Sequence, residues 1–215
     1  KFADWRRMWT AAGHAGPMPR QFLMRVVHVA ETDTKVCENP AAALKLAKGT
    51  TRTGKFLEMM AKNVTVALGC DGVNSADHKD MLRAMFLAAT VPKDANFDPQ
   101  AITAERVIEM ATLNGYRAIG WDRDLGTLEA GKKADLILID IDRPEWVPSY
   151  NLLYSLVYSA SGDSVDTVIV DGRILMEGRE LKTIDLDEVF AHCRELAPQL
   201  LERANVKPES RWPVV

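Results

Sequence analysis

The sequence predicts an α/β fold in which part of a parallel (β/α) barrel is followed by short antiparallel strands and a C-terminal helix. The first observation is the segment 64–72, VTVALGCDG, a β-branched apolar run that ends in Gly-Cys-Asp-Gly. A strand that is apolar on both faces is typical of a parallel sheet covered by helices. The second observation is the alternation of helix and strand patterns up to about Gly126, and the third is the change there to short strands joined by a tight turn.

Asp71 stands where the strand at 64–69 reaches the surface. In a (β/α)₈ barrel the carboxyl ends of the strands carry the chemistry, so this carboxylate is a candidate functional group. An Asp-Gly pair after a strand is more often a turn, and that alternative stays open at this stage.

The part before Gly126 alternates helices with apolar strands. Thr103 is a suitable N-cap for the last of its helices, and Asn114-Gly115 is a suitable end for it. The predicted elements are, in order, a helix at 2–12, strands at 22–29 and 35–37, a helix at 54–62, a strand at 64–69, and helices at 80–89 and 102–114.

The part after Gly126 has a different pattern. A strand is predicted at 134–141, and residues 167–176 form a hairpin around Asp171-Gly172, the dipeptide typical of a two-residue turn. Asp185 caps a final helix, with Glu188 three residues on as in a capping box. The apolar residues of that helix are expected to pack against other parts of the protein; they are Val189, Cys193, Leu196 and Leu200.

Composition excludes several classes of function. The chain has 215 residues, 47% of them hydrophobic, enough for a core in one large domain or two small ones. A net charge of −3 without a basic block argues against a nucleic-acid partner. No apolar run approaches the roughly 18 residues of a membrane span, and residues 1–9 carry no apolar signal stretch. Three cysteines without a CxxC spacing indicate reduced thiols and a cytoplasmic protein.

Four segments, taken in order, resemble the amidohydrolase superfamily, and within it the deaminase and chlorohydrolase branch that acts on purines, pyrimidines and triazines. HVAET at 28–32 resembles the strand-five motif of that branch, and NPAAALKLAKG at 39–49 resembles its loop after strand seven. VALGCDG at 66–72 resembles strand eight. LGTLEAGKKADLILID at 125–140 resembles the exit from the barrel into a small β-sandwich. The resemblance implies a partial metal-dependent-hydrolase barrel of the TIM type at 1–125, a β-sandwich part at 126–180, and a C-terminal helix and tail at 181–215.

The resemblance also implies a metal-dependent hydrolase of non-peptide carbon–nitrogen bonds that deaminates a heterocyclic amine. His28 and Asp71 would bind a divalent metal, zinc or else iron, which lowers the pKa of a bound water. Asp71 could accept the proton of that water, and Glu31 could deliver one to the ring nitrogen or the leaving amine. Taken alone, a histidine in a strand is more often a core residue, and a glutamate in a loop is more often a solvated charge.

Three further residues are candidates for substrate binding. Asn39 opens the strand-seven segment at 39–49, Glu38 stands just before it, where a histidine is common, and His78 follows Asp71 by seven residues. The alanines 41–43 that follow Asn39-Pro40, together with Glu38, suggest a less polar and differently charged pocket wall, and therefore a substrate unlike the family's usual adenine-type ligands. We expect a small heterocyclic substrate and a homo-oligomer.

Two departures from the family's pattern are visible in the sequence. There is no HxH pair, which strand one of the family carries, and His28 and Asp71 are 43 positions apart, where roughly 90 are expected between strands five and eight. Strand six with its histidine is therefore missing, and we predict a chain discontinuity between Thr32 and Asp33. Either the sequence joins separate pieces of a longer enzyme, or it is a truncated, catalytically inactive relative with an interaction or structural role.

Overall fold

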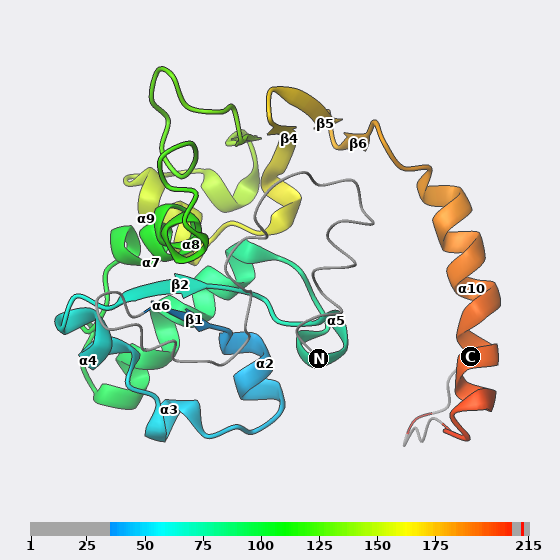
Figure 1. Cartoon of the computed structure of the whole chain (residues 1–215), viewed down its shortest axis with the longest axis horizontal. Coiled ribbons are helices and arrows are strands. Elements are labelled where there is room, and N and C mark those ends of the chain that lie inside the picture. The colour runs from blue at the N-terminus through cyan, green and yellow to red at the C-terminus, as the bar shows by residue number, and fades with distance from the viewer. Residues whose placement is uncertain (1–34, 208–211, 213–215) are drawn as a thin grey trace.

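The computed structural model describes residues 35–207 and 212 (Figure 1). The predicted elements at 2–12 and 22–29, the candidates His28 and Glu31, and the predicted break between Thr32 and Asp33 lie outside these residues. The strands are β1 (Lys35–Glu38), β2 (Thr65–Leu68), β3 (Leu136–Ile139), β4 (Val165–Val170), β5 (Arg173–Glu177) and β6 (Glu180–Leu181). The helices are α2 (Pro40–Lys45), α3 (Thr50–Thr53), α4 (Phe56–Ala61), α5 (Val73–Ala76), α6 (Met81–Asn96), α7 (Ala104–Ala111), α8 (Leu113–Ile119), α9 (Leu152–Tyr158) and α10 (Leu186–Arg203), with short 3₁₀ turns at Pro144–Trp146 and Gly162–Ser164.

Strands β1 and β2 pair in parallel, which confirms the two parallel strands predicted at 35–37 and 64–69. Their register aligns Val36 with Val66 and Glu38 with Leu68, and the N–H of Gly69 continues the ladder to the carbonyl of Glu38 at 2.8 Å. The carboxyl ends of both strands therefore lie side by side. This is the edge of a parallel sheet at which (β/α) folds place their functional groups.

Helices α6 and α7 cover one face of this pair. Val66 and Leu68 are buried in the main core together with Met85 of α6 and Met110 of α7. Because partners in a parallel ladder point to the same side of the sheet, Glu38, the partner of Leu68, also faces the helices. The neighbouring positions of the ladder, Cys37, Asn39, Ala67 and Gly69, belong to the opposite face.

Asp80 connects the N-terminus of α6 to the C-terminal part of the chain. Its Oδ1 atom accepts hydrogen bonds from the backbone N–H groups of Leu82 and Arg83, and its Oδ2 atom accepts one from Gly162 at 3.1 Å. The helix, predicted at 80–89, continues through Pro92 to Asn96. One carboxylate thus caps α6 and fixes the turn that leads into β4.

The helix predicted at 102–114 is two helices. Thr103 caps the first as expected, accepting from Arg106 N at 3.3 Å, but α7 ends at Ala111 and α8 begins at Leu113. The prediction that Asn114-Gly115 ends the helix is wrong. Asn114 is buried inside α8, and its amide donates a 3.0 Å hydrogen bond to the carbonyl of Val66 in β2.

The C-terminal part contains a four-stranded antiparallel sheet of order β3-β4-β5-β6. The predicted hairpin is confirmed: β4 and β5 pair around Asp171 and Gly172, whose φ angles of 51° and 74° are the positive values that a type I′ turn requires. The predicted strand at 134–141 is β3 in this sheet, not part of the parallel pair. Over the residues described, the strands establish neither a closed barrel nor a β-sandwich.

Helix α10 begins as predicted, with Asp185 Oδ1 accepting from the N–H groups of Asp187 and Glu188. The expected packing of its apolar residues is not found in the described structure, where Val189, Leu196 and Leu200 are 41%, 51% and 59% exposed. Figure 1 shows the helix set apart from the other elements. Within residues 35–207, helices are too short or too polar to cross a membrane.

Candidate functional site

Asp71 follows β2 in a sharp turn and carries a mostly buried carboxylate. Its φ angle of 62° lies in the left-handed region, which Asp tolerates better than most residues do. One carboxylate oxygen accepts from the N–H of Gly72 at 2.6 Å, and the other lies 3.6 Å from the ammonium of Lys48. Lys79 donates to the backbone carbonyl of Asp71. The side chain is 10% exposed, so this carboxylate is held at the strand end with one cation beside it.

Asn39 occupies the same end of the sheet, one residue after β1. Its Oδ1 atom lies 2.7 Å, and the Cys37 sulfur 2.9 Å, from where a Cβ on Gly69 would stand. Only glycine fits at position 69 without moving these groups. This close approach places Asn39 against the strand that leads into Asp71, so the structure brings these two predicted site residues to one strand edge.

Two cysteines lie near this edge. Burial raises the pKa of the Cys37 thiol, against a smaller lowering by its hydrogen bond from Asn39, and the nearby Glu38, Cys70 and Asp71 raise it further. Burial likewise raises the pKa of Cys70, whose thiol points to the carbonyl of Asp80 at 3.7 Å. Burial therefore favours the protonated thiol over the thiolate at both cysteines.

His78 lies in the loop between α5 and α6. Its Nδ1 atom accepts a hydrogen bond from the N–H of Asp80 at 3.2 Å, which in a neutral ring puts the proton on Nε2. The Nε2 atom is buried and has no hydrogen-bond partner among the described residues. A buried donor without a partner is costly, so this nitrogen is suited to an acceptor atom of a ligand. Its assignment to substrate binding stays a prediction.

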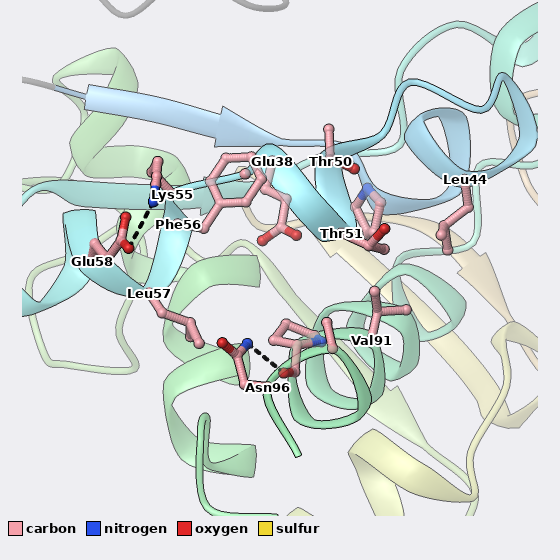
Figure 2. Close-up of a pocket in the computed structure, with 14 residues that line it drawn as sticks. Glu38, Leu44, Thr50, Thr51, Lys55, Phe56, Leu57, Glu58, Val91 and Asn96 are labelled. Carbon is pink, nitrogen blue, oxygen red and sulfur yellow. Dashed lines mark hydrogen bonds and ion pairs between the residues drawn. The ribbon is translucent and has the colours of Figure 1, made fainter. Parts of the chain in front are cut away.

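The Glu38 side chain points to the helix-covered face of the β1–β2 pair, away from Asn39 and Gly69. Its carboxylate is directed into a cavity (Figure 2). The cavity has a volume of about 100 Å³ and is lined by the end of β1, the α3–α4 segment and the C-terminal half of α6. The Glu38 carboxylate and Asp71 therefore lie on opposite sides of the β1–β2 pair, and not in one substrate pocket as the sequence motifs predict. The alanines predicted to line the pocket do not do so. Ala41 and Ala42 are buried against Ala76 in a small core.

Of the two predicted metal ligands, His28 and Asp71, only Asp71 lies in the part of the chain that the structure describes. Over positions 35–207 and 212, no three His, Cys, Asp or Glu side chains gather closely enough to hold a metal ion. His28, the other predicted ligand, and Glu31, the predicted proton donor, lie outside the described residues. The buried Asp71 carboxylate is a suitable oxygen ligand for a divalent metal, and the remaining donors would come from other parts of the protein.

Lys48 was not among the residues that we selected from the sequence, although it lies within the strand-seven motif at 39–49. Its ammonium reaches Asp71 from the loop between α2 and α3, where Gly49 turns the chain with a φ angle of 70°. The sequence around Lys48 does not predict its ion pair with Asp71, because the two residues follow different strands, β1 and β2, which the parallel pairing brings together.

A parallel α/β pair with a buried carboxylate at its carboxyl edge is an arrangement typical of (β/α)-barrel enzymes. The chain matches the amidohydrolase family over residues 10–175, most of its length, and it belongs to that family. The resemblance found in the four sequence motifs is thereby confirmed.

Among curated proteins, similar relatives are 5-methylthioadenosine/S-adenosylhomocysteine deaminases. That of Thermoanaerobacter pseudethanolicus is 40% identical over 185 residues, which cover 82% of this chain and 42% of the relative. That of Moorella thermoacetica is 45% identical over 163 residues, covering 76% of this chain and 37% of the relative. The chain thus spans about two fifths of the length of these relatives.

Among solved structures, an adenosine deaminase of Xanthomonas campestris with bound zinc superposes with a TM-score of 0.72 at 30% identity, over 77% of this chain and 37% of that one. The atrazine chlorohydrolase of Arthrobacter aurescens, complexed with zinc, gives a TM-score of 0.69 at 26% identity, over 75% of this chain and 35% of that one. The described α/β elements therefore correspond to part of an amidohydrolase-type fold.

Proposed function

We propose that this chain forms part of a metal-dependent amidohydrolase that removes an amino group from a heterocyclic amine by hydrolysis, with an adenine-containing nucleoside as the substrate class. The observation that carries the proposal is the Asp71 carboxylate, buried at the carboxyl end of β2 in a family member. Support for the substrate class comes from the relatives, which are named as deaminases of 5-methylthioadenosine, S-adenosylhomocysteine and adenosine. Support for zinc comes from neighbours solved with that metal.

Asp71 would have two roles in this chemistry. With His28 it would hold a divalent metal, which supplies a hydroxide from bound water at neutral pH. As the base beside that water, the carboxylate would take up the proton released on attack at the amino-bearing carbon. Glu31 would deliver a proton to the ring nitrogen or to the leaving amine, so that nitrogen leaves as neutral ammonia.

Asn39 and His78 would contact the substrate. Support for Asn39 is its close approach to Gly69 at the strand edge, and support for His78 is its Nδ1 atom, which accepts a hydrogen bond from the N–H of Asp80 and leaves Nε2 for a ligand. The buried Nε2–H of His78 would donate to a ring nitrogen or to a hydroxyl oxygen. Glu38 has no part in this proposal, because its carboxylate faces the helices.

Ammonia release tests the activity. The purified chain, incubated with zinc, is assayed with adenosine and 5′-methylthioadenosine, with the pyrimidine cytosine as a control substrate. Saturable release from the nucleosides supports the proposal. No release from any of them, together with no bound zinc, would contradict it.

The second candidate is an inactive relative with a structural role. It is favoured by the absence of a three-residue metal cluster from the described part of the chain. The metal content of the purified protein separates the two candidates, because an inactive relative of this kind would hold no zinc.

A further inference from the structure

The cavity beside Glu38 has features of a ligand site that is separate from the Asp71 edge. It lies on the helix-covered face of the β1–β2 pair, whereas Asn39 and Gly69 mark the opposite face. Its walls are mixed: Phe56 and Leu57 lie on one side and Val91 on the other, as Figure 2 shows, and polar side chains make up the rest of the lining. At about 100 Å³ it is smaller than the roughly 150 Å³ cavity that accepts benzene, so it suits a ligand of a few heavy atoms.

Glu38 is the charged group directed into this cavity. The residue is only 9% exposed, and within the described chain its carboxylate takes part in none of the ion pairs or side-chain hydrogen bonds. Burial alone raises the pKa of this carboxyl to about 7, as expected where no cation offsets the loss of hydration. A buried carboxylate without a partner is an unfavourable arrangement that a cation of the right size would relieve.

The charged groups around the cavity do not supply that cation. Lys55, on its rim, is 63% exposed and pairs with Glu58 at 2.9 Å, so its ammonium is turned to that partner, as Figure 2 shows. Farther out, Arg52 of α3 and Asp94 of α6 line a wider groove of about 720 Å³ that shares Leu44, Lys55 and Val91 with the cavity. This groove gives a small solute a route from solvent to Glu38.

We propose that the Glu38 cavity binds a small organic cation, such as a guanidinium or a primary ammonium group, through an ion pair with the Glu38 carboxylate. The planar guanidinium group offers two parallel N–H donors that match the two carboxylate oxygens. Thr51 and Asn96 stand at the mouth with polar side chains that can accept from the outer N–H groups. This site is independent of the proposed deamination, since it uses the other face of the sheet.

The test is an NMR titration of the ¹⁵N-labelled chain with guanidinium chloride in the millimolar range, with urea as the neutral molecule of the same shape. At pH 8 we expect saturable shifts of the backbone amides of Thr51, Leu57 and Asn96 with guanidinium and none with urea. Because the carboxyl must be ionised, the dissociation constant should be about tenfold weaker at pH 6 than at pH 8.

Two variants complete the experiment. Glu38→Gln keeps the shape of the side chain and removes its charge, so the saturable response should be lost while the circular dichroism spectrum is kept. Glu109→Gln removes an exposed carboxylate on α7, outside the cavity, and should respond as the parent does. Shifts that do not saturate, that are equal for urea, or that persist in Glu38→Gln would overturn the proposal. A failed deamination assay would leave this result unaffected, because it uses neither metal nor nucleoside.

Discussion

The ammonium of Lys48 lies 3.6 Å from the Asp71 carboxylate, and both side chains are largely buried, at 22% and 10% exposure. A cation therefore already faces the carboxylate that we propose as a metal ligand. A metal bound there would share one carboxylate with a lysine and would be repelled by it. If Asp71 is a metal ligand, Lys48 would lower the affinity of this strand edge for the metal.

Replacement of this lysine should strengthen metal binding. With Lys48→Met the carboxylate loses its competing cation, and since exposed or partly buried pairs are worth up to about 1 kcal/mol, we expect zinc affinity to rise about fivefold. Zinc titration against a chelating indicator measures the effect. Lys45→Met is the matched control, because Lys45 pairs with the exposed Asp77. An unchanged or lower zinc affinity in Lys48→Met would show that the lysine does not compete.

The close approach at Gly69 predicts a large effect from one methyl group. In Gly69→Ala the new Cβ would stand 2.7 Å from Asn39 Oδ1 and 2.9 Å from Cys37 Sγ, so both must move. We expect a loss of about 1–3 kcal/mol in the free energy of unfolding, measured in urea. Gly115→Ala is the control, since a Cβ there meets nothing within 4 Å in helix α8 and should be neutral or stabilising. Equal stability of the two variants would refute the steric account.

Asn114 predicts a second structural effect. Its amide is the donor to the carbonyl of Val66, and Asn114→Ala would leave that buried carbonyl without this partner. The free energy of unfolding should fall by about 1–3 kcal/mol. Asn96→Ala, in which an exposed amide loses only a hydrogen bond to Pro92 of its own helix, should change stability by less than about 0.5 kcal/mol. If both variants lower the free energy of unfolding by the same amount, the hydrogen bond from Asn114 of α8 to Val66 of β2 does not stabilise the fold more than an exposed one does.

Local signals made several elements of the described fold predictable, but not α2, α3, α5, α9 or β6. The hairpin at Asp171-Gly172 and the caps at Thr103 and Asp185 depend on residues within a few positions of one another. The direction of Glu38 could not be predicted in the same way, because it depends on the register of β1 against β2. The position of Asn114 depends in turn on a carbonyl that lies 48 residues away in sequence.

The candidate site was predictable only in part for the same reason. Asp71 follows from the strand that ends before it and from the family motif, and the structure places it at that strand end. Its partner Lys48 is a contact between two loops, which no spacing indicates. The metal ligand His28 and the proton donor Glu31 stay predictions, because they lie outside the described residues.

Glu38 predicts a pH dependence of stability. The folded chain holds its proton up to about pH 7, whereas the unfolded chain loses it near the ordinary value of 4.5. Stability contributed by this group therefore falls as the pH rises from about 4.5 to 7, by about 3 kcal/mol at 1.36 kcal/mol per pKa unit. Glu38→Gln does not titrate, so the stability of the variant relative to the parent should rise by that amount between pH 4.5 and 8. Urea unfolding at several pH values measures it, and a flat difference would contradict the burial of an unpaired carboxyl.

Asp71 and Asp77 offer a matched pair for the central proposal. Both are aspartates with left-handed φ angles of 62° and 61°, and both lie beside a lysine, but Asp77 is exposed and outside the proposed site. Asn is a good residue at such φ angles, so Asp71→Asn and Asp77→Asn should both fold. Only the first should reduce hydrolysis, by roughly 10²–10⁴-fold for the loss of a general base.

The most direct measurement is the zinc content of the parent chain and of these two variants by plasma mass spectrometry after dialysis. If Asp71 is a metal ligand, the parent and Asp77→Asn should retain zinc in equal amounts, and Asp71→Asn should lose most of it. Equal zinc in Asp71→Asn and the parent, or none in the parent, would contradict the assignment of Asp71 to a metal site.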